Sequence, residues 1–339
     1  MSVNIVLLIV GLGIIFLAAE LFTNAIEWFG KHLRISEGAI GSVFAAVGTA
    51  LPETMVPIIA FINGGKSNHD AGVGAILGAP MMLSTLAMFV TGAAVLIFAS
   101  QGHRKRSIQA DYKVVGRDLR TFFAVYLLAL LAAFLPTKAL KLAVAGLLVL
   151  FYAWYVRQTL LCPDCENAES EMRPLYFRRR KEVPELVWVI AQLLLGLALI
   201  IFGAKIFVNC VSAVSAALGI SAVVLSVIIT PIATELPEKF NSITWMRHKK
   251  DTLALGNITG AMVFQSSLLP AIGILFTGWG LSDLGHAGIA AILIALLASS
   301  VLWGEMMLLK KLSPYSLLAG GLIYALYPIY VFGIAHGRP

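Results

Sequence analysis

The stretch Gly48-Thr49-Ala50-Leu51-Pro52-Glu53 decides the fold, because a near copy, Ala233-Thr234-Glu235-Leu236-Pro237-Glu238, occurs 185 positions later. Each copy lies inside a long apolar run, so each places a glutamate where the core of a lipid bilayer is expected. A charged side chain there costs roughly 2.5–3.5 kcal/mol on insertion scales, so it usually has a function or a partner. The repeat predicts that Glu53 and Glu238 face each other and hold a cation.

The composition is that of a membrane protein. Of the 339 residues, 59% are hydrophobic and 13% are charged, and the mean hydropathy is +0.88. A soluble domain has about 25% charged residues. Uncharged stretches recur at the length of about 20 residues that a helix needs to cross a bilayer. The net charge of +7 does not indicate nucleic-acid binding, because the basic residues lie in loops between apolar runs.

The sequence predicts an all-α polytopic membrane protein with ten transmembrane helices, arranged as two inverted five-helix repeats. The shift of 185 positions aligns the first apolar segment with the sixth and the second with the seventh. Because five is odd, the second half enters the membrane in the opposite sense, as in secondary transporters built from inverted repeats. The predicted segments are 4–29, 38–63, 70–99, 119–135, 139–160, 185–214, 221–245, 252–279, 284–304 and 314–335.

The loop charges predict the orientation in the cell membrane. Loops after odd-numbered segments hold 19 of the 25 lysines and arginines, and the opposite side holds four. By the positive-inside rule, both termini are expected outside the cell and residues 161–184 in the cytoplasm. The chain is therefore divided into a first five-helix repeat, 1–160, a cytoplasmic linker, 161–184, and a second five-helix repeat, 185–339.

The two motifs supply oxygen atoms on one face of a helix. Each places a threonine and a glutamate four residues apart, Thr49 with Glu53 and Thr234 with Glu238. The proline of each motif removes a backbone donor and leaves carbonyl oxygens about one turn earlier available as ligands. Those carbonyls belong to Ala46, Val47, Ile229 or Thr230. Carboxylates, hydroxyls and carbonyls are the ligands of hard cations such as Ca²⁺ and Na⁺.

Glycine-rich segments follow both motifs. The patterns Gly74-x-x-x-Gly78 and Gly256-x-x-x-Gly260 allow helices to approach closely. Asn257 and Gln265 lie on the second of these segments, on roughly one helix face. Kinked structural helices with tolerated glutamates would explain a single motif. Two copies, each in the second segment of its half, favour a cation site.

In these features the chain resembles the calcium:cation antiporter superfamily, which includes the sodium/calcium exchangers. The resemblance rests on the Gly-Thr-x-x-Pro-Glu pattern, which begins with Ala233 in its second copy, and on Gly256-Asn257-x-x-Gly260. It implies a ten-helix fold in which helices two, three, seven and eight surround a site that opens alternately to each side. The ligand positions of the family carry over onto four residues of this chain: Glu53, Glu238, Thr49 and Thr234.

The chain departs from the sodium/calcium exchangers at several positions. Those proteins usually have serine after the motif threonine, where this chain has Ala50 and Glu235. Their Gly-Ser-Asn after the second glycine motif is replaced here by Gly78-Ala79-Pro80 and Gly260-Ala261-Met262. Several sodium ligands of the family are thus absent, so sodium coupling has less support than a divalent-cation site.

Glu235 adds a third carboxylate, three residues from Glu238. Three clustered carboxylates cannot all stay ionised without a divalent cation or protons, since like charges and desolvation both raise carboxylate pKa values. We therefore expect a divalent cation and protons to compete for the site. The predicted ligand set is Glu53, Glu238, Thr49, Thr234, Glu235, Asn257, Gln265 and Ala46.

Three further features leave alternatives open. Glu20 and Lys205 occupy equivalent positions in the two repeats, and they either form an ion pair or remain separate solvated charges. Lys239 either neutralises a neighbouring carboxylate or, in the favoured interpretation, points away from it. Cys162-Pro-Asp-Cys165 could hold zinc only if a homodimer shared the ion, because zinc needs four ligands, so reduced thiols are favoured.

The leading hypothesis is a membrane transporter and not an enzyme. It would be a secondary active antiporter that exchanges Ca²⁺, or a similar divalent cation, for Na⁺ or H⁺, without a cofactor and with membrane lipid and inorganic cations as partners. The alternative is a cation channel or uniporter that uses the same two glutamates, and flux without a counter-ion gradient would favour it. An intramembrane hydrolase is disfavoured, because the sequence contains no His-Glu-x-x-His and no Gly-x-Ser-x-Gly.

Overall fold

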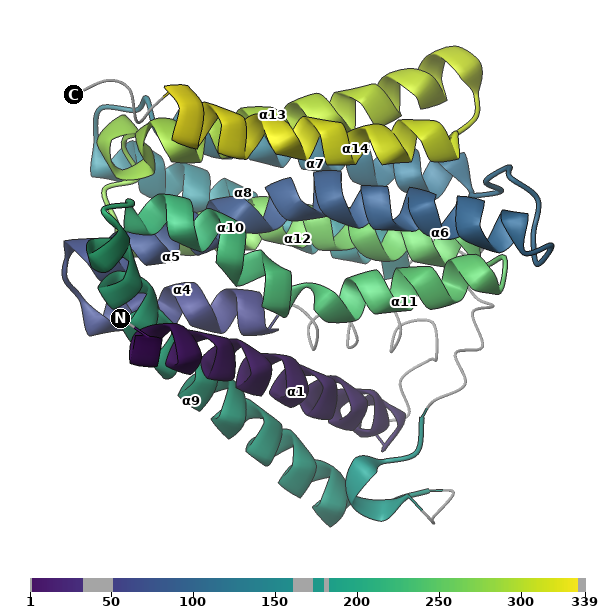
Figure 1. Ribbon diagram of the computed structural model, residues 1–339, viewed down its shortest axis with the longest axis horizontal. Helices are drawn as coiled ribbons and strands as arrows, with labels where there is room; N and C mark the ends of the chain where they lie inside the picture. Colours follow the sequence, from purple (N-terminus) through teal and green to yellow (C-terminus); the bar gives the residue numbers. More distant parts are fainter. Residues whose placement is uncertain (1, 33–50, 161–172, 180–182, 335–339) are drawn as a thin grey trace.

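The computed structural model describes residues 2–32, 51–160, 173–179 and 183–334, and the regular structure in these ranges is entirely helical (Figure 1). A π-helical turn, Leu83–Ala87, joins two of the helices of the first half into one continuous stretch. The helices of the first half are α1 (Ser2–His32), α4 (Leu51–Asn63), α5 (Lys66–Met82), α6 (Met88–Ser100), α7 (Tyr112–Ala132) and α8 (Lys138–Leu160).

The second half begins after a short 3-10 turn, Tyr176–Arg178. Its helices are α9 (Leu186–Leu218), α10 (Ala222–Thr234), α11 (Leu236–Arg247), α12 (Asp251–Phe276), α13 (Leu281–Leu309) and α14 (Pro314–Pro328), followed by a π-helical turn, Ile329–Ile334. Local signals set several ends: the Ser221 hydroxyl caps α10 by accepting from Val224 N, and Gly219, with a φ of 65°, ends α9.

Seven helical stretches of the described residues are long and apolar enough to cross a membrane. They confirm the prediction of an all-α membrane protein. Two predicted segments differ from this pattern: 119–135 falls on α7, which carries several charged residues, and 221–245 is divided between α10 and α11. Part of the segment 38–63 lies outside the described residues. The count of ten therefore stays a prediction.

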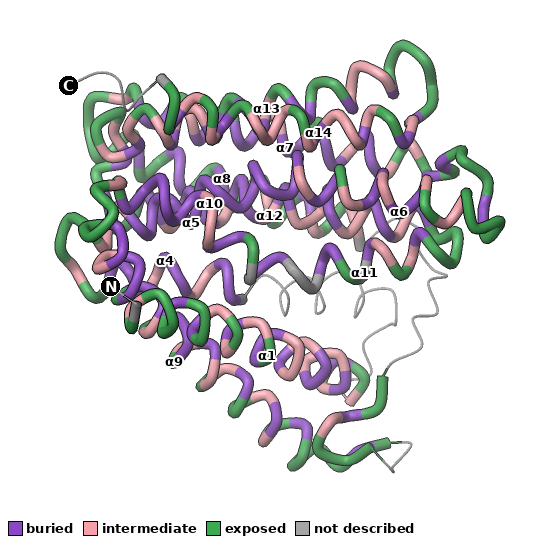
Figure 2. Tube along the Cα trace, viewed as in Figure 1, coloured by how far each residue is buried: buried purple, intermediate pink, exposed green. Residues whose placement is uncertain are grey.

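The helices differ in how deeply they are buried. Helices α1 and α9 pack side by side at one edge of the molecule, and α13 and α14 pack together at the opposite edge (Figure 1). Between them, the most apolar windows of Lys66–Ser100 and Asp251–Phe276 are 61% and 72% buried, against 28% for Leu186–Leu218. Figure 2 shows the same contrast along the chain. The central helices α5 and α12 therefore bring the two halves together.

Helices α5 and α10 approach closely at the first glycine pair. A Cβ atom added to Gly74 would lie 2.5 Å from Val223 O, and one added to Gly78 would lie 2.4 Å from Val227 O. No side chain fits at these distances, so the backbones can touch only because both positions are glycine. The predicted role of Gly74-x-x-x-Gly78 in close packing is confirmed. The same prediction for Gly256-x-x-x-Gly260 is wrong, because an added Cβ there would meet only side-chain atoms, Val114 Cγ1 at 3.8 Å and Tyr155 Oη at 3.3 Å.

Candidate cation site

Glu53 lies in the first turn of α4, directly after Pro52. Its side chain is 3% exposed, and neither carboxylate oxygen has a hydrogen-bond partner in the described part of the chain. Thr49 and Ala46, two of the predicted ligands, lie outside the described residues.

Glu238 occupies the corresponding place in the first turn of α11, directly after Pro237. Helices α10 and α11 meet at Glu235, whose φ of −98° and ψ of 9° interrupt the helix. Pro237 cannot donate a backbone hydrogen bond, and the first turn is where a helix tolerates that loss. Both Glu235 and Glu238 are buried, at 0% and 1% exposure.

The three carboxylates come from both halves of the chain and lie near one another. Glu235 and Glu238 are both close enough to Glu53 to repel its negative charge, and Glu238 also acts on Glu235. Buried like charges are unfavourable unless a cation or protons compensate them. The structure therefore brings together the acidic residues of the two motifs; what they bind stays a prediction.

Two other predicted ligands lie beside these carboxylates. Thr234 is buried next to Glu53, and its hydroxyl donates to Thr230 O at 3.1 Å. Gln265 on α12 is buried next to Glu235, and its Oε1 has no hydrogen-bond partner among the described residues. Asn257, two turns earlier on α12, is half-buried. Thr234 and Gln265 thus leave oxygen lone pairs available near the carboxylates.

A stripe of polar side chains on α10, formed by Ser226, Thr230 and Thr234, extends the site toward α5. This stripe is not among the features predicted from the sequence. Ser226 Oγ donates to Ala71 O at 2.7 Å and shares a hydrogen bond of 2.8 Å with Thr230 Oγ1. Ser226, Thr230, Thr234 and Glu238 recur every four residues. That spacing is the signal in the sequence that could have revealed the stripe.

The favoured interpretation of Lys239, that its side chain points away, is wrong. Its Nζ lies 3.4 Å from Glu235 Oε2 and 3.4 Å from the carbonyl oxygen of Pro231. Pro231 O also accepts from the backbone N–H of Glu235 at 3.2 Å. The backbone carbonyl that contacts the Lys239 ammonium is therefore that of Pro231. It is not one of the four carbonyls that the sequence suggested as ligands.

Glu20 finds its partners in the segment that precedes α9 and not in Lys205. Its Oε1 accepts from Tyr176 Oη at 2.6 Å and lies 3.3 Å from Arg173 Nη1. One turn further along α1, Asn24 Nδ2 donates to Arg173 O at 3.1 Å. Of the two alternatives, the ion pair with Lys205 is therefore wrong, and Glu20 instead contributes to a contact between α1 and residues 173–178.

No group of three acidic, histidine or cysteine side chains in the described ranges is arranged to hold a metal ion by itself. A cation at the carboxylates would therefore also need hydroxyl, amide or carbonyl oxygens, which Thr234, Gln265 and the helix ends supply. Cys210 is a buried free thiol in α9, and Cys162 and Cys165 lie outside the described residues.

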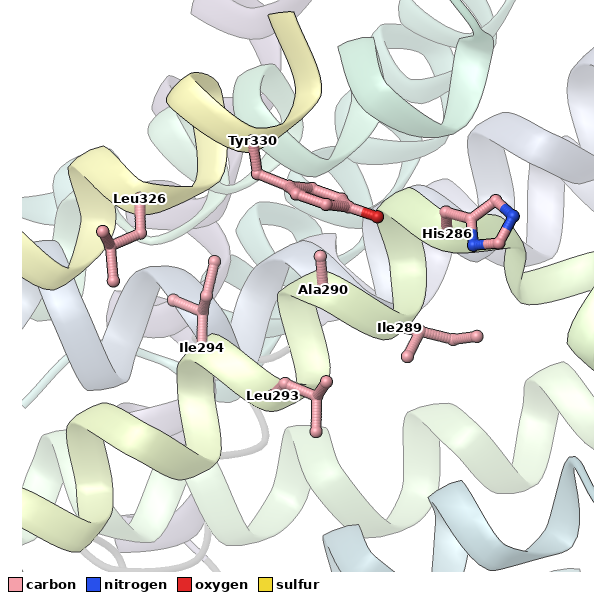
Figure 3. Close-up of a pocket in the computed structure, with 7 residues that line it drawn as sticks. All are labelled: His286, Ile289, Ala290, Leu293, Ile294, Leu326 and Tyr330. Carbon is pink, nitrogen blue, oxygen red and sulfur yellow. The ribbon is translucent and has the colours of Figure 1, made fainter. Parts of the chain in front are cut away.

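A cavity of about 340 Å³ between α13 and α14 is separate from the carboxylates (Figure 3). Its lining is aliphatic except for two side chains, and Figure 3 shows the Tyr330 hydroxyl on the side of His286. The lining residues are His286, Ile289, Ala290, Leu293, Ile294, Leu326 and Tyr330. None of them is a predicted ligand, so this cavity does not belong to the candidate cation site.

Comparison with known proteins identifies the family. CaxA of Alkalimonas amylolytica, a candidate antiporter, is 27% identical over 320 residues, which cover 90% of this chain and 92% of CaxA. The structure of the H⁺/Ca²⁺ exchanger CAX superposes with a TM-score of 0.73 at 16% identity, over 98% of this chain and 88% of that one. The sodium–calcium exchanger NCX_Mj gives a TM-score of 0.58 at 20% identity, over 98% and 99% of the two chains.

These two structures show a shared fold, and each comparison covers 98% of this chain. The sequence profile of the sodium/calcium exchanger protein family matches this chain twice, over residues 3–160 and 188–335. The two matches separate the two glutamate motifs, so each half carries one. This chain therefore belongs to the sodium/calcium exchanger protein family.

Proposed function

We propose that this chain is a secondary active antiporter that exchanges Ca²⁺, or a similar divalent cation, for Na⁺ or H⁺ by alternating access. Its family makes it a cation antiporter of the membrane and not an enzyme. The identity of the ions is the part that we infer. The inference rests on the chemistry of the buried oxygen atoms around the two motifs.

The observation that carries the proposal is the matched position of Glu53 and Glu238. Each is buried and directly follows a proline, and each belongs to a different half of the chain. A carboxylate without hydrogen-bond donors, such as Glu53, is unfavourable in a membrane unless a cation binds it. Carboxylate and neutral oxygens together suit Ca²⁺ better than a soft metal.

Alternating access is supported by the repeat. When two related halves of opposite orientation contribute to one site near the middle of the membrane, rocking of one part against the other can open the site to either side. The site is lopsided, because α10, α11 and α12 contribute Glu235, Glu238, Thr234 and Gln265, whereas the described part of the first half contributes Glu53. This acidity favours competition between a divalent cation and protons.

Uptake of ⁴⁵Ca²⁺ into proteoliposomes tests the proposal. We expect uptake when an outward Na⁺ gradient or an outward proton gradient is imposed, and loss of that uptake in Glu53→Gln and in Glu238→Gln. Asp111→Asn is the control, because this residue caps α7 at the surface and asparagine caps equally well. Uptake that needs neither gradient would contradict antiport and indicate a channel or uniporter.

A further inference from the structure

Lys239 places a positive charge inside the candidate cation site. Its side chain is 11% exposed, and its Nζ lies 3.4 Å from both Glu235 Oε2 and Pro231 O. A carboxylate oxygen and a backbone carbonyl are the ligands that a hard monovalent cation would use. We propose that the Lys239 ammonium permanently occupies a monovalent-cation subsite at Glu235, so that the exchanged ions carry two positive charges in each direction. This inference rests on the proposed function.

The break between α10 and α11 creates the subsite. Lys239 follows Glu235 by four residues, so its side chain reaches back over one turn of α11 to the residue at the break. At the same point α10 ends, and Pro231 O accepts from Glu235 N at 3.2 Å while it also faces the ammonium. The sequence and the helix break thus hold the positive charge in one place.

The charge balance follows from the groups that surround the carboxylates. In the described part of the chain, the charged groups that act on Glu53 are Glu235 and Glu238, and those that act on Glu235 are Lys239 and Glu238. Counted over these described groups, the three carboxylates and one ammonium carry a formal charge of −2, which one divalent cation would neutralise. Bound ions whose charges sum to more or less than +2 would leave a net charge inside the membrane, which is unfavourable. We therefore infer that a divalent cation exchanges for two monovalent charges without net charge movement.

A lysine that only stabilises the break would have different consequences. Its replacement would then lower stability without changing how many monovalent ions the protein binds. If the ammonium occupies a cation subsite, its removal should allow Na⁺ to bind at Glu235 in its place. The number of bound Na⁺ ions therefore separates the two roles.

Equilibrium binding of ²²Na⁺ to the purified full chain tests the subsite without any transport measurement. We expect Lys239→Met to bind one more Na⁺ per chain than the wild type, and the double variant Lys239→Met/Glu235→Gln to lose that extra ion. Lys239→Arg, which keeps the positive charge, should bind as the wild type does. Equal Na⁺ binding by the wild type and Lys239→Met would overturn the proposal. Lys239→Gln is the second variant if Lys239→Met does not fold.

The net charge moved across the membrane per Ca²⁺ ion tests the second part of the proposal, the exchange of two positive charges in each direction. A measurement on the wild type alone can contradict this part. Membrane current and ⁴⁵Ca²⁺ flux are measured on the same proteoliposomes. We expect about zero net charge per Ca²⁺ for the wild type and for Lys205→Met, a lysine of α9 away from the carboxylates, and about one charge for Lys239→Met. A wild-type current of one charge per Ca²⁺ would contradict the inference while leaving antiport intact. Absence of gradient-driven flux would contradict the proposed function, and the ²²Na⁺ result would still decide the role of Lys239.

Discussion

Asp118 and Glu53 are both buried carboxylates, but only one of them is surrounded by hydrogen-bond donors. Asp118 on α7 accepts from Tyr155 Oη at 3.0 Å and from Thr259 Oγ1 at 2.7 Å, and it pairs with Arg117 at 3.1 Å. Glu53 accepts from no described side chain or backbone N–H. A carboxylate with three donors stabilises the fold, whereas one without donors is available to an ion.

This difference predicts opposite effects of substitution. Asp118→Ala would leave the buried hydroxyl of Tyr155 without its acceptor, at a cost of about 1–3 kcal/mol for each unsatisfied group, so the thermal unfolding temperature in detergent should fall. Glu53→Gln removes a buried charge that lies near two others, so it should unfold no earlier than the wild type while ⁴⁵Ca²⁺ uptake is lost. If Glu53→Gln were the less stable variant, Glu53 would be a structural residue.

Arg104 and Asp251 form a buried ion pair between the two halves. Arg104 Nη1 and Nη2 lie 2.8 and 2.7 Å from the two carboxylate oxygens of Asp251, and both side chains are almost completely buried. Gln109 N donates to the same carboxylate at 2.7 Å. The pair fixes the α6–α7 loop against the start of α12.

Removal of one partner of this pair should cost about 3–5 kcal/mol, because the other charge stays buried alone. We expect Arg104→Met and Asp251→Asn each to lower the stability of the protein, and the double variant to be more stable than the sum of the two effects predicts. Chemical denaturation of the four proteins measures the coupling. Simple additivity would show that the two side chains do not interact.

At the scale of single residues, the sequence identifies only the functional residues that stand in a repeated motif. Glu53 and Glu238 can be identified because each stands in a copy of one motif, whereas Asp118, Arg104 and Asp251 have no counterpart that marks them. Their roles depend on partners far away in the chain. The same holds for Lys239: its spacing from Glu235 is visible in the sequence, but its direction depends on the break at that residue.

The helix pair α5 and α10 forms a close backbone contact between the two halves. Gly78 faces Val227 there, and an added Cβ atom would also lie 2.8 Å from Val227 Cα. The contact places the polar stripe of α10 against α5. Changes at this contact should therefore affect both stability and the site.

Gly78→Ala should destabilise the protein by about 1–3 kcal/mol, since an added methyl group in a tightly packed interface forces the helices apart. Gly146→Ala is the matched control: it lies on the exposed face of α8, and an added Cβ would meet no described atom within 4 Å. Thermal unfolding compares the two variants. Equal unfolding temperatures would mean that α5 and α10 do not need their close approach.

The helices themselves follow from the apolar runs, and most described residues of the predicted segments are helical. The exceptions are residues at segment ends, such as 133–135 and 277–279, and Glu235, where the helix breaks. The sequence does not predict the contact of residues 173–178 with α1, in which Trp28 Nε1 and Asn24 Nδ2 both donate to Arg173 O. It places Glu20 and Asn24 in the membrane interior by hydropathy. Polar groups of the irregular segment 173–178 instead form hydrogen bonds with these two side chains. No local pattern in the sequence predicts such a contact.

Inversion of the two halves predicts that equivalent loops lie on opposite sides of the membrane. Lys66, at the start of α5, and Lys249, between α11 and α12, are exposed and follow the motif helices of their respective halves. In a cysteine-free background, Lys66→Cys should react with an impermeant maleimide added outside intact cells. Lys249→Cys should react only after the membrane is opened. Labelling of both from the same side would exclude inverted repeats.

The central claim for the whole molecule is that both halves contribute acidic oxygens to one divalent cation. Calorimetric titration of the purified full chain with Ca²⁺ tests it most directly. The account predicts one Ca²⁺ per chain, with affinity reduced at least tenfold, or about 1.4 kcal/mol, in Glu53→Gln and separately in Glu238→Gln, and unchanged in Asp111→Asn. Wild-type affinity in either glutamine variant would contradict a site shared by the two halves.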